Sequence, residues 1–148
     1  MTTIRRIEDI QAWQKARELV REIYGFCSKG ALSKDFALRS QICRAAISSM
    51  SNVAEGFARK SDKEFARFLD VAKGSTIEVQ SLLYAGLDIG YISPKEFERL
   101  HGVAEETAAL IGGFTSYLRK VYHPPTPGPG ARSPKSGPLT PDSGLGDP

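Results

Sequence analysis

The sequence has few of the residues that build catalytic centres and covalent frameworks. Its 148 residues include two cysteines, Cys27 and Cys43, and two histidines. Two cysteines without paired spacing exclude a disulfide scaffold and a zinc-finger type of site, so we interpret both as small buried thiols. The first residues contain no apolar run typical of a signal peptide, and no later run is long and uncharged enough to span a membrane. We therefore expect a cytoplasmic protein with no membrane partner.

Proline is nearly absent before residue 123. Of the nine prolines in the sequence, Pro94 is the one that precedes this point. The same part of the chain lacks the alternating apolar and polar runs, bounded by hairpin turns, that indicate strands. We therefore predict one all-α domain over residues 1–122, an antiparallel up-down four-helix bundle.

Residues 123–148 form a Pro/Gly/Ser-rich segment with two isolated leucines, Leu139 and Leu145. This segment cannot bury enough apolar surface to offset the entropy lost on ordering, so we predict a disordered tail. We interpret the tail as passive, and a polyproline II ligand is the alternative.

The helix boundaries are indicated by capping residues. Ser61 and Glu64 have the spacing of a capping box, in which both side chains satisfy free backbone N–H groups, and Ser93 and Glu96 have the same spacing. Pro94 occupies the first helical position, where helices accept proline. Glycines at positions 30 and 90 can adopt the left-handed conformation that ends a helix. The predicted helices cover residues 8–28, 34–58, 61–90 and 93–121.

Apolar residues recur at steps of three and four along each predicted helix, as bundle packing requires. The predicted seams are Ile10, Trp13, Ala16, Val20, Ile23 and Cys27 in the first helix, Leu38, Ile42, Ala45, Ser49 and Val53 in the second, Phe65, Leu69, Ala72, Thr76, Val79, Leu83 and Gly86 in the third, and Phe97, Leu100, Ala104, Thr107, Ile111, Phe114, Leu118 and Val121 in the fourth. A second apolar set lies at other helical angles and consists of Phe57, Phe68, Val71, Leu82, Tyr84, Tyr91 and Tyr117. These residues are either ordinary surface side chains or a subunit interface.

A polar stripe runs along the second predicted helix. It consists of Gln41, Arg44, Ser48, Asn52 and Glu55. In the third helix, Gly74 and Ser75 offer a point of close approach, and Glu78 follows one turn later. We interpret four residues as a structural polar network that fixes helix register: Asn52, Glu55, Ser75 and Glu78. Catalysis is the alternative, but no nucleophile or metal ligand accompanies these carboxylates.

Glu98 and His101 form a Glu-x-x-His motif like those of di-iron bundle proteins. Such a site needs a second copy of the motif on another helix, and the sequence contains none. We therefore predict no metal, no cofactor and no catalytic residue. His101 is interpreted as an edge residue beside Phe97 and Ala104.

Basic residues are concentrated in the first half of the chain. Residues 1–73 contain 14 Lys and Arg against 9 Asp and Glu, whereas residues 74–122 contain 4 against 6. The predicted nucleic-acid-binding residues are Arg39, Arg44, Arg59, Lys60, Lys63 and Arg67, joined by Arg5, Arg6, Lys15, Arg17 and Arg21. The alternative for any single residue is an ordinary solvent-exposed cation near acidic side chains, with no role in binding. As a cluster repeated around an oligomer, these cations can bind phosphates.

Three stretches together resemble a known family. They are Ile10-Gln-Ala-Trp13-Gln-Lys-Ala16, then Ser40-Gln-Ile-Cys-Arg44-Ala45-Ala46 with Ser48 and Asn52-Val-Ala-Glu55-Gly56, and finally Glu64-Phe65 with Phe68-Leu69, Ala72, Gly74-Ser75 and Glu78. Over residues 4–121 the chain resembles the bacterial four-helix bundle proteins encoded by intervening sequences in the 23S rRNA gene. At Cys43 it departs from the pair of adjacent basic residues that the family often shows, so one expected charge is missing.

The resemblance implies a homo-oligomer, commonly a barrel-like pentamer, with no enzymatic activity. It also implies a relation to the bundles that accompany the reverse transcriptase of diversity-generating retroelements and bind nucleic acid through a positively charged surface. We therefore expect a non-enzymatic accessory protein that binds RNA or DNA. A scaffold that docks a reverse transcriptase or another polymerase is the alternative, and an enzymatic role would rest on Glu55, Glu78 and His101.

Overall fold

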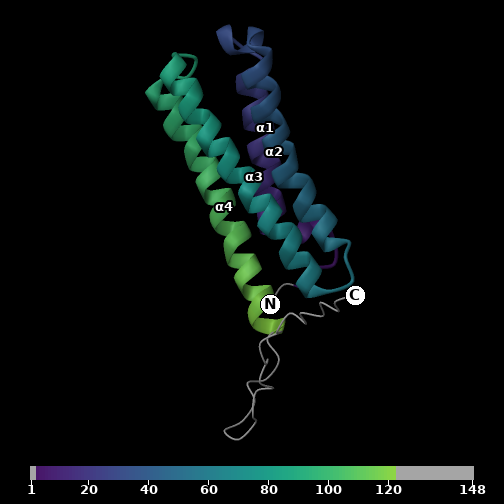
Figure 1. The fold of residues 1–148 in the computed structure, drawn as a ribbon. Helices are drawn as coiled ribbons and strands as arrows, with labels where there is room; N and C mark the ends of the chain where they lie inside the picture. The colour runs from purple at the N-terminus through teal and green to yellow at the C-terminus, as the bar shows by residue number, and fades with distance from the viewer. Residues whose placement is uncertain (1–2, 123–148) are drawn as a thin grey trace, which may run out of the picture.

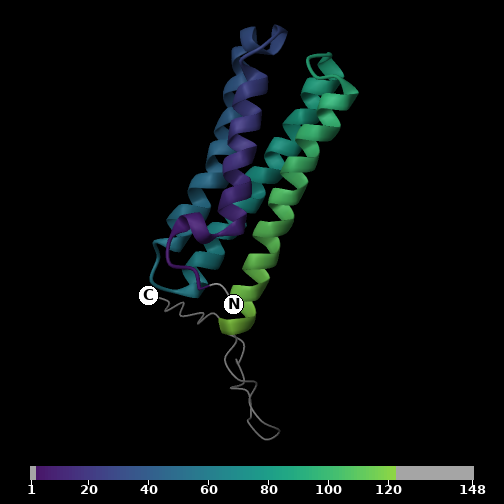
Figure 2. The same cartoon turned by 180° about the vertical axis from the view of Figure 1, so that it is seen from behind.

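The computed structural model describes residues 3–122, which fold into an all-α bundle without strands in that range. The helices are α1 (Gln11–Cys27), α2 (Phe36–Phe57), α3 (Asp62–Ile89) and α4 (Pro94–Tyr122), with short 3-10 helices η1 (Ile7–Asp9) and η2 (Ala31–Lys34). The helices alternate in direction along one long axis (Figure 1, Figure 2). The predicted four-helix bundle is confirmed. The predicted tail, residues 123–148, lies outside the described residues.

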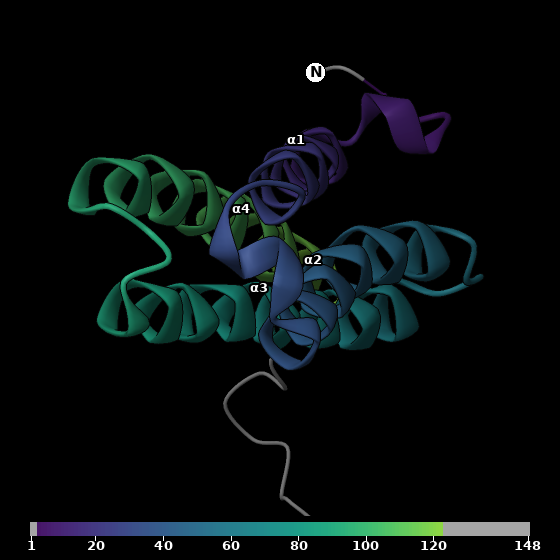
Figure 3. The ribbon, with the colours of Figure 1, turned by 90° about the horizontal axis from the view of Figure 1, so that it is seen from above.

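Each helix packs against two others, so that α1 and α3 both contact α2 and α4. Seen from above, α1 and α3 lie on opposite sides of the bundle (Figure 3). The turns at residues 28–35 and 90–93 lie at one end of the molecule, and the connection from α2 to α3 lies at the other end with the last turn of α4 (Figure 1). No helix within residues 3–122 combines the length and apolarity needed to cross a membrane.

Local capping explains where the helices begin and end. The Ser61 hydroxyl accepts a hydrogen bond from the Glu64 backbone N–H at 3.2 Å, and the Ser93 hydroxyl accepts one from the Glu96 N–H at the same distance. Gly90 ends α3 in the left-handed conformation with φ of 92°. The serine half of each predicted capping box is therefore confirmed.

The core follows the predicted seams closely. All seven predicted residues of the α3 seam are buried. In α4 the prediction for Val121 is wrong, since its side chain is 60% exposed. Val121 lies in the last turn of α4, at the rim of a hollow where the bundle ends. Thr115 is buried in the same helix, and its hydroxyl donates to the Ile111 carbonyl.

The close approach between α2 and α3 occurs at Gly56. A Cβ placed on Gly56 would lie 2.6 Å from Cδ2 of Phe65 and 2.8 Å from Cβ of Phe68. The close approach predicted at Gly74 and Ser75 is made by Ser75, which meets Ser48 of α2, whereas a Cβ placed on Gly74 would meet nothing within 4 Å. Glycine at position 56 lets the end of α2 cross closely over the start of α3.

Candidate nucleic-acid interface

The six predicted nucleic-acid-binding residues form two groups, one in the first half of α2 and one just after its end. The turn pair, Arg39 and Arg44, lies in the first half of α2. The junction cluster lies where α2 leads into α3 and consists of Arg59, Lys60, Lys63 and Arg67. Because an α-helix rises about 1.5 Å per residue, Arg44 lies about 20 Å from the end of α2 at Phe57. The structure therefore offers two cationic sites on one pair of helices.

All four side chains of the junction cluster are exposed. The Arg59 guanidinium lies over the Phe68 ring, 4.6 Å from its centroid. Arg59, Phe68 and Arg67 line one shallow hollow of about 320 Å³, together with Val71 and Glu64. Asp62 and Glu64 share this part of the chain, so four cations face two carboxylates and an excess of two positive charges remains.

The turn pair borders a second hollow of about 440 Å³ between α1 and α2. Arg39 is half-buried there, and its Nη1 donates to the Ser33 carbonyl at 2.8 Å. Arg44 is exposed on the same hollow. Phe36, which is 72% exposed, and Tyr24 complete this apolar and cationic surface.

Within residues 3–122, none of these six cations takes part in an ion pair. Other cations do, and the pairs are Arg6 with Asp9, Lys15 with Glu18 and Glu106, Arg99 with Glu22, and Arg119 with Asp70. The cations of the turn pair and the junction cluster therefore form no ion pair with a carboxylate of the described chain.

Lys15, which the sequence analysis grouped with the basic surface, forms ion pairs with two carboxylates of the same chain. Its Nζ lies 2.7 Å from Glu106 of α4 and 3.0 Å from Glu18. The hydrogen bond with Glu106 and then that with Glu18 raise the pKa of the Lys15 ammonium. Lys15 therefore joins α1 to α4.

Three of the four residues of the predicted polar network, Asn52, Ser75 and Glu78, form hydrogen bonds along the contact between α2 and α3, and the prediction for Glu55 is wrong. The Ser48 and Ser75 hydroxyl oxygens are 2.7 Å apart, and Nδ2 of Asn52 donates to the Ser48 carbonyl at 2.8 Å and to its hydroxyl at 3.0 Å. Glu78 accepts a hydrogen bond from Nε2 of Gln41 at 3.3 Å. Glu55 is exposed, and no hydrogen bond to its carboxylate occurs within the described residues.

A second hydrogen-bonded pair lies deeper in the same contact. The Ser49 and Thr76 hydroxyl oxygens are 2.7 Å apart, and both residues are fully buried. The Thr76 hydroxyl donates to the Ala72 carbonyl at 2.8 Å. Because a hydroxyl has one hydrogen, Ser49 must be the donor to Thr76. The sequence placed both residues in the apolar seams and missed this pair.

His101 lies in an aromatic cluster on the outer side of α3 and α4. Its ring stacks on Phe97 with centroids 5.0 Å apart and meets Tyr84 edge-on at 5.6 Å. Nε2 of His101 lies 3.4 Å from Nε2 of Gln80. In residues 3–122, no group of three or more His, Cys, Asp or Glu side chains could hold a metal ion. The surroundings of His101 are thus those of a packed edge residue.

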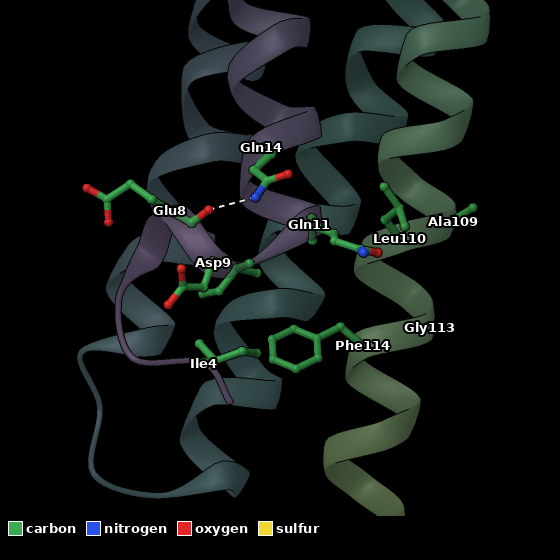
Figure 4. Close-up of a pocket in the computed structure, with 11 residues that line it drawn as sticks. Ile4, Glu8, Asp9, Gln11, Gln14, Ala109, Leu110, Gly113 and Phe114 are labelled. Carbon is green, nitrogen blue, oxygen red and sulfur yellow. Dashed lines mark hydrogen bonds between the residues drawn. The ribbon is translucent and has the colours of Figure 1, made fainter. Parts of the chain in front are cut away.

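A hollow of about 660 Å³ lies between the N-terminal segment and α4 (Figure 4). Ile4 and Phe114 face one another across it (Figure 4). Gln14, which also lines the hollow, donates a hydrogen bond to the Glu8 carbonyl at 2.6 Å (Figure 4). None of the six predicted cations borders this hollow. Its lining offers no cationic group for phosphate.

The sequence model of the 23S rRNA-intervening sequence protein family matches residues 8–113. The chain belongs to this family. The match contains both the turn pair and the junction cluster, and it includes the contact between α2 and α3. Membership was expected from the resemblance and is confirmed. Among curated proteins, none matches the chain.

A solved structure has the same fold as this family member. It is a protein of unknown function from the S23 ribosomal protein family of Bacteroides thetaiotaomicron, which is 22% identical and superposes with a TM-score of 0.64. The similarity covers 70% of this chain and 97% of the other. At this level of identity, the likeness shows the fold alone.

Proposed function

We propose that this chain is a non-enzymatic nucleic-acid-binding protein, with RNA or DNA phosphates held by the turn pair and the junction cluster. One observation carries the proposal: the four cations of the junction cluster lie close together in the chain at one connection, all are exposed, and none of them forms an ion pair within the described chain. Free cations on a surface attract polyanions, because each phosphate contact releases condensed counterions.

Aromatic side chains beside the cations support the proposal. Phe68 lies under the Arg59 guanidinium, and Phe36 and Tyr24 border the hollow of the turn pair. Aromatic and guanidinium planes can stack on unpaired bases, while the charges contact the phosphates. This combination suits single-stranded segments and loops better than a smooth duplex.

Assembly into a homo-oligomer is part of the proposal, and the resemblance implies a pentamer. Ile47 of α2 and Ile77 of α3 are 43% and 49% exposed. The open space at Gly74 lies on the same pair of helices. A second copy would cover this surface and multiply the cationic sites. Light scattering tests it: one defined oligomer is expected, and a monomer at micromolar concentration would contradict the proposal.

Fluorescence anisotropy with two matched quadruple variants tests nucleic-acid binding. The junction variant replaces Arg59, Lys60, Lys63 and Arg67 by glutamine, and the control variant replaces the four ion-paired cations Arg6, Lys15, Arg99 and Arg119 in the same way. Both variants lose four positive charges. We expect binding to single-stranded RNA or DNA at low salt to weaken at least about tenfold in the junction variant relative to the control. Equal weakening would show that net charge alone matters, and no binding by the wild type would remove the proposal.

A protein scaffold that docks a reverse transcriptase or another polymerase is the second candidate. A hollow of about 630 Å³ at the end of the bundle favours it, because Phe57, Phe65, Phe114 and Tyr117 border it beside Arg59 and Lys60. Such an apolar recess could receive a side chain of a partner. Capture of the polymerase that persists after nuclease treatment would favour this function, and capture that nuclease abolishes would favour nucleic-acid binding.

A further inference from the structure

The two cysteines of the chain lie together in the fold. Cys27 is the last residue of α1, and Cys43 lies in the second turn of α2. Both are free thiols, 2% and 9% exposed, and they belong to the same apolar cluster. Neither takes part in the proposed phosphate contacts, so the pair needs its own explanation.

Both cysteines border the hollow between α1 and α2, so a small reagent entering it meets them together. Arg39 and Ser40 line the same hollow. The two residues also pack in one apolar cluster, so the end of α1 brings Cys27 to the part of α2 that carries Cys43. The two thiols therefore border one hollow of about 440 Å³, whereas isolated core thiols would lie apart from each other.

The surroundings make the two thiols unequal. Burial, followed by the charge of Cys43 and the hydrogen bond with it, raises the pKa of Cys27 to about 12. Burial also raises the pKa of Cys43, but the hydrogen bond with Cys27 and the charge of Arg39 act in the opposite direction. Cys43 is also the more exposed thiol, at 9% against 2% for Cys27, so a reagent in the hollow reaches Cys43 first.

We propose that Cys27 and Cys43 form a redox pair that closes into an intramolecular disulfide by exchange with a small-molecule disulfide such as oxidised glutathione. The Cys43 thiolate attacks one sulfur of glutathione disulfide, and the first glutathione leaves as a thiolate. Cys27 then gives up its proton and attacks the Cys43 sulfur of the mixed disulfide, which expels the second glutathione. The two protein thiols are oxidised by two electrons, and one glutathione disulfide is reduced to two thiols that take up the two protons.

The disulfide would join the end of α1 to α2 and close a loop that contains η2 and Arg39. A crosslink between groups that the native fold already holds together stabilises that fold, because it restricts the unfolded chain. The oxidised protein is therefore more heat-stable than the reduced protein. This inference does not depend on nucleic-acid binding.

Equilibration of the full chain in glutathione redox buffers tests the pair. Acid quenching, alkylation of free thiols and intact mass give the fraction of intramolecular disulfide, with and without guanidinium chloride. We expect the native chain to hold the disulfide at least about tenfold more strongly than the unfolded chain, and to melt at a higher temperature when oxidised. An equal or weaker disulfide in the native chain, or only glutathione adducts and intermolecular dimers, would overturn the proposal.

Single serine variants test the order of attack. Cys27→Ser leaves Cys43, which should form the glutathione adduct faster than Cys27 does in Cys43→Ser. Equal or reversed rates would overturn the role of Cys43 as the attacking thiol. The wild-type equilibrium is measured without these variants, so the pairing itself is tested even if one of them folds poorly.

Discussion

Two contacts within the same bundle are held by different chemistry. Between α1 and α4, Lys15 pairs with Glu106 and Arg99 pairs with Glu22. Between α2 and α3, the cross-helix bonds are those of Ser48 with Ser75, Ser49 with Thr76 and Gln41 with Glu78. Hydroxyl, amide and carboxylate groups fix the register of α2 on α3 without using an arginine or a lysine. The comparison teaches that cations hold the contact between α1 and α4, whereas the contact between α2 and α3 uses neither an arginine nor a lysine of those two helices.

The close packing of α2 on α3 is the most sensitive point of this comparison. In Gly56→Ala the new methyl group would collide with Phe65 and with Cβ of Phe68. We expect a loss of about 2–3 kcal/mol in the free energy of unfolding, measured by urea denaturation. The control Gly74→Ala meets open space in a helix, so it should raise the stability of a monomer by about 0.5–1 kcal/mol. A neutral effect at Gly56 would contradict the close approach, and a loss at Gly74 would indicate a second copy packed there.

The buried hydroxyl pair should give the next largest effect. Thr76→Val removes the acceptor of Ser49 and leaves a buried donor without its partner. We expect a loss of about 1–2 kcal/mol in the free energy of unfolding. Addition of Ser49→Ala to Thr76→Val should cost less than the sum of the single changes, because the unpaired donor disappears. Strictly additive costs in this double-mutant cycle would show that the two hydroxyls act independently.

The ion pairs of α1 and α4 should give a smaller effect that depends on salt. Glu106 is exposed, so Glu106→Gln should cost about 0.2–1 kcal/mol at low ionic strength. Most of this loss should vanish at about 1 M salt, where the screening length is about 3 Å. Thermal unfolding at two salt concentrations measures the difference. A loss that stays constant with salt would assign the effect to packing of the side chain.

The junction cluster should give the smallest effect on stability. Lys63→Gln and Arg67→Gln remove exposed charges that form no ion pair in the described chain. The free energy of unfolding of the double variant should stay within about 0.5 kcal/mol of the wild type. A clear loss in urea denaturation would mean that these cations stabilise the fold, which would weaken the argument that they serve a partner.

Local chemistry made much of the fold predictable. Ser61, Ser93 and Gly90 mark helix ends through bonds and dihedral angles within a few residues, and the sequence contains all of that information. The seam of α3 was equally accessible, because apolar periodicity does not depend on which helix is the neighbour. Helix boundaries and core faces follow from such short-range rules.

Contacts between segments that are distant in the sequence could not be predicted in the same way. Lys15 was predicted to be part of the basic surface, because nothing near it in the sequence indicates its contact with Glu106 of α4. Ser49 and Thr76 occupy seam positions, and a seam pattern does not reveal that two hydroxyls meet. The close approach at Gly56 did have a signal, since Gly56 continues the spacing of Ser49 and Val53 on the buried face of α2.

The grouping of the six cations was only partly predictable. The sequence indicated a cluster at the connection between α2 and α3, and the structure places Arg59 there over Phe68. The distance that separates this cluster from the turn pair follows from the length of α2. The engagement of Arg39 with the Ser33 carbonyl depends on the path of the chain through η2, which no sequence pattern specified.

The salt dependence of nucleic-acid binding tests the central claim most directly. The slope of log K against log salt concentration is measured by anisotropy for the wild type, the junction variant and the control variant that lacks the four ion-paired cations. If the junction cluster contacts phosphates, its loss should make the slope less steep by about 0.7–0.9 for each phosphate contact removed, and the control should keep a slope close to that of the wild type. Identical slopes for the two variants would contradict the claim that the unpaired cations of α2 and α3 form the binding surface.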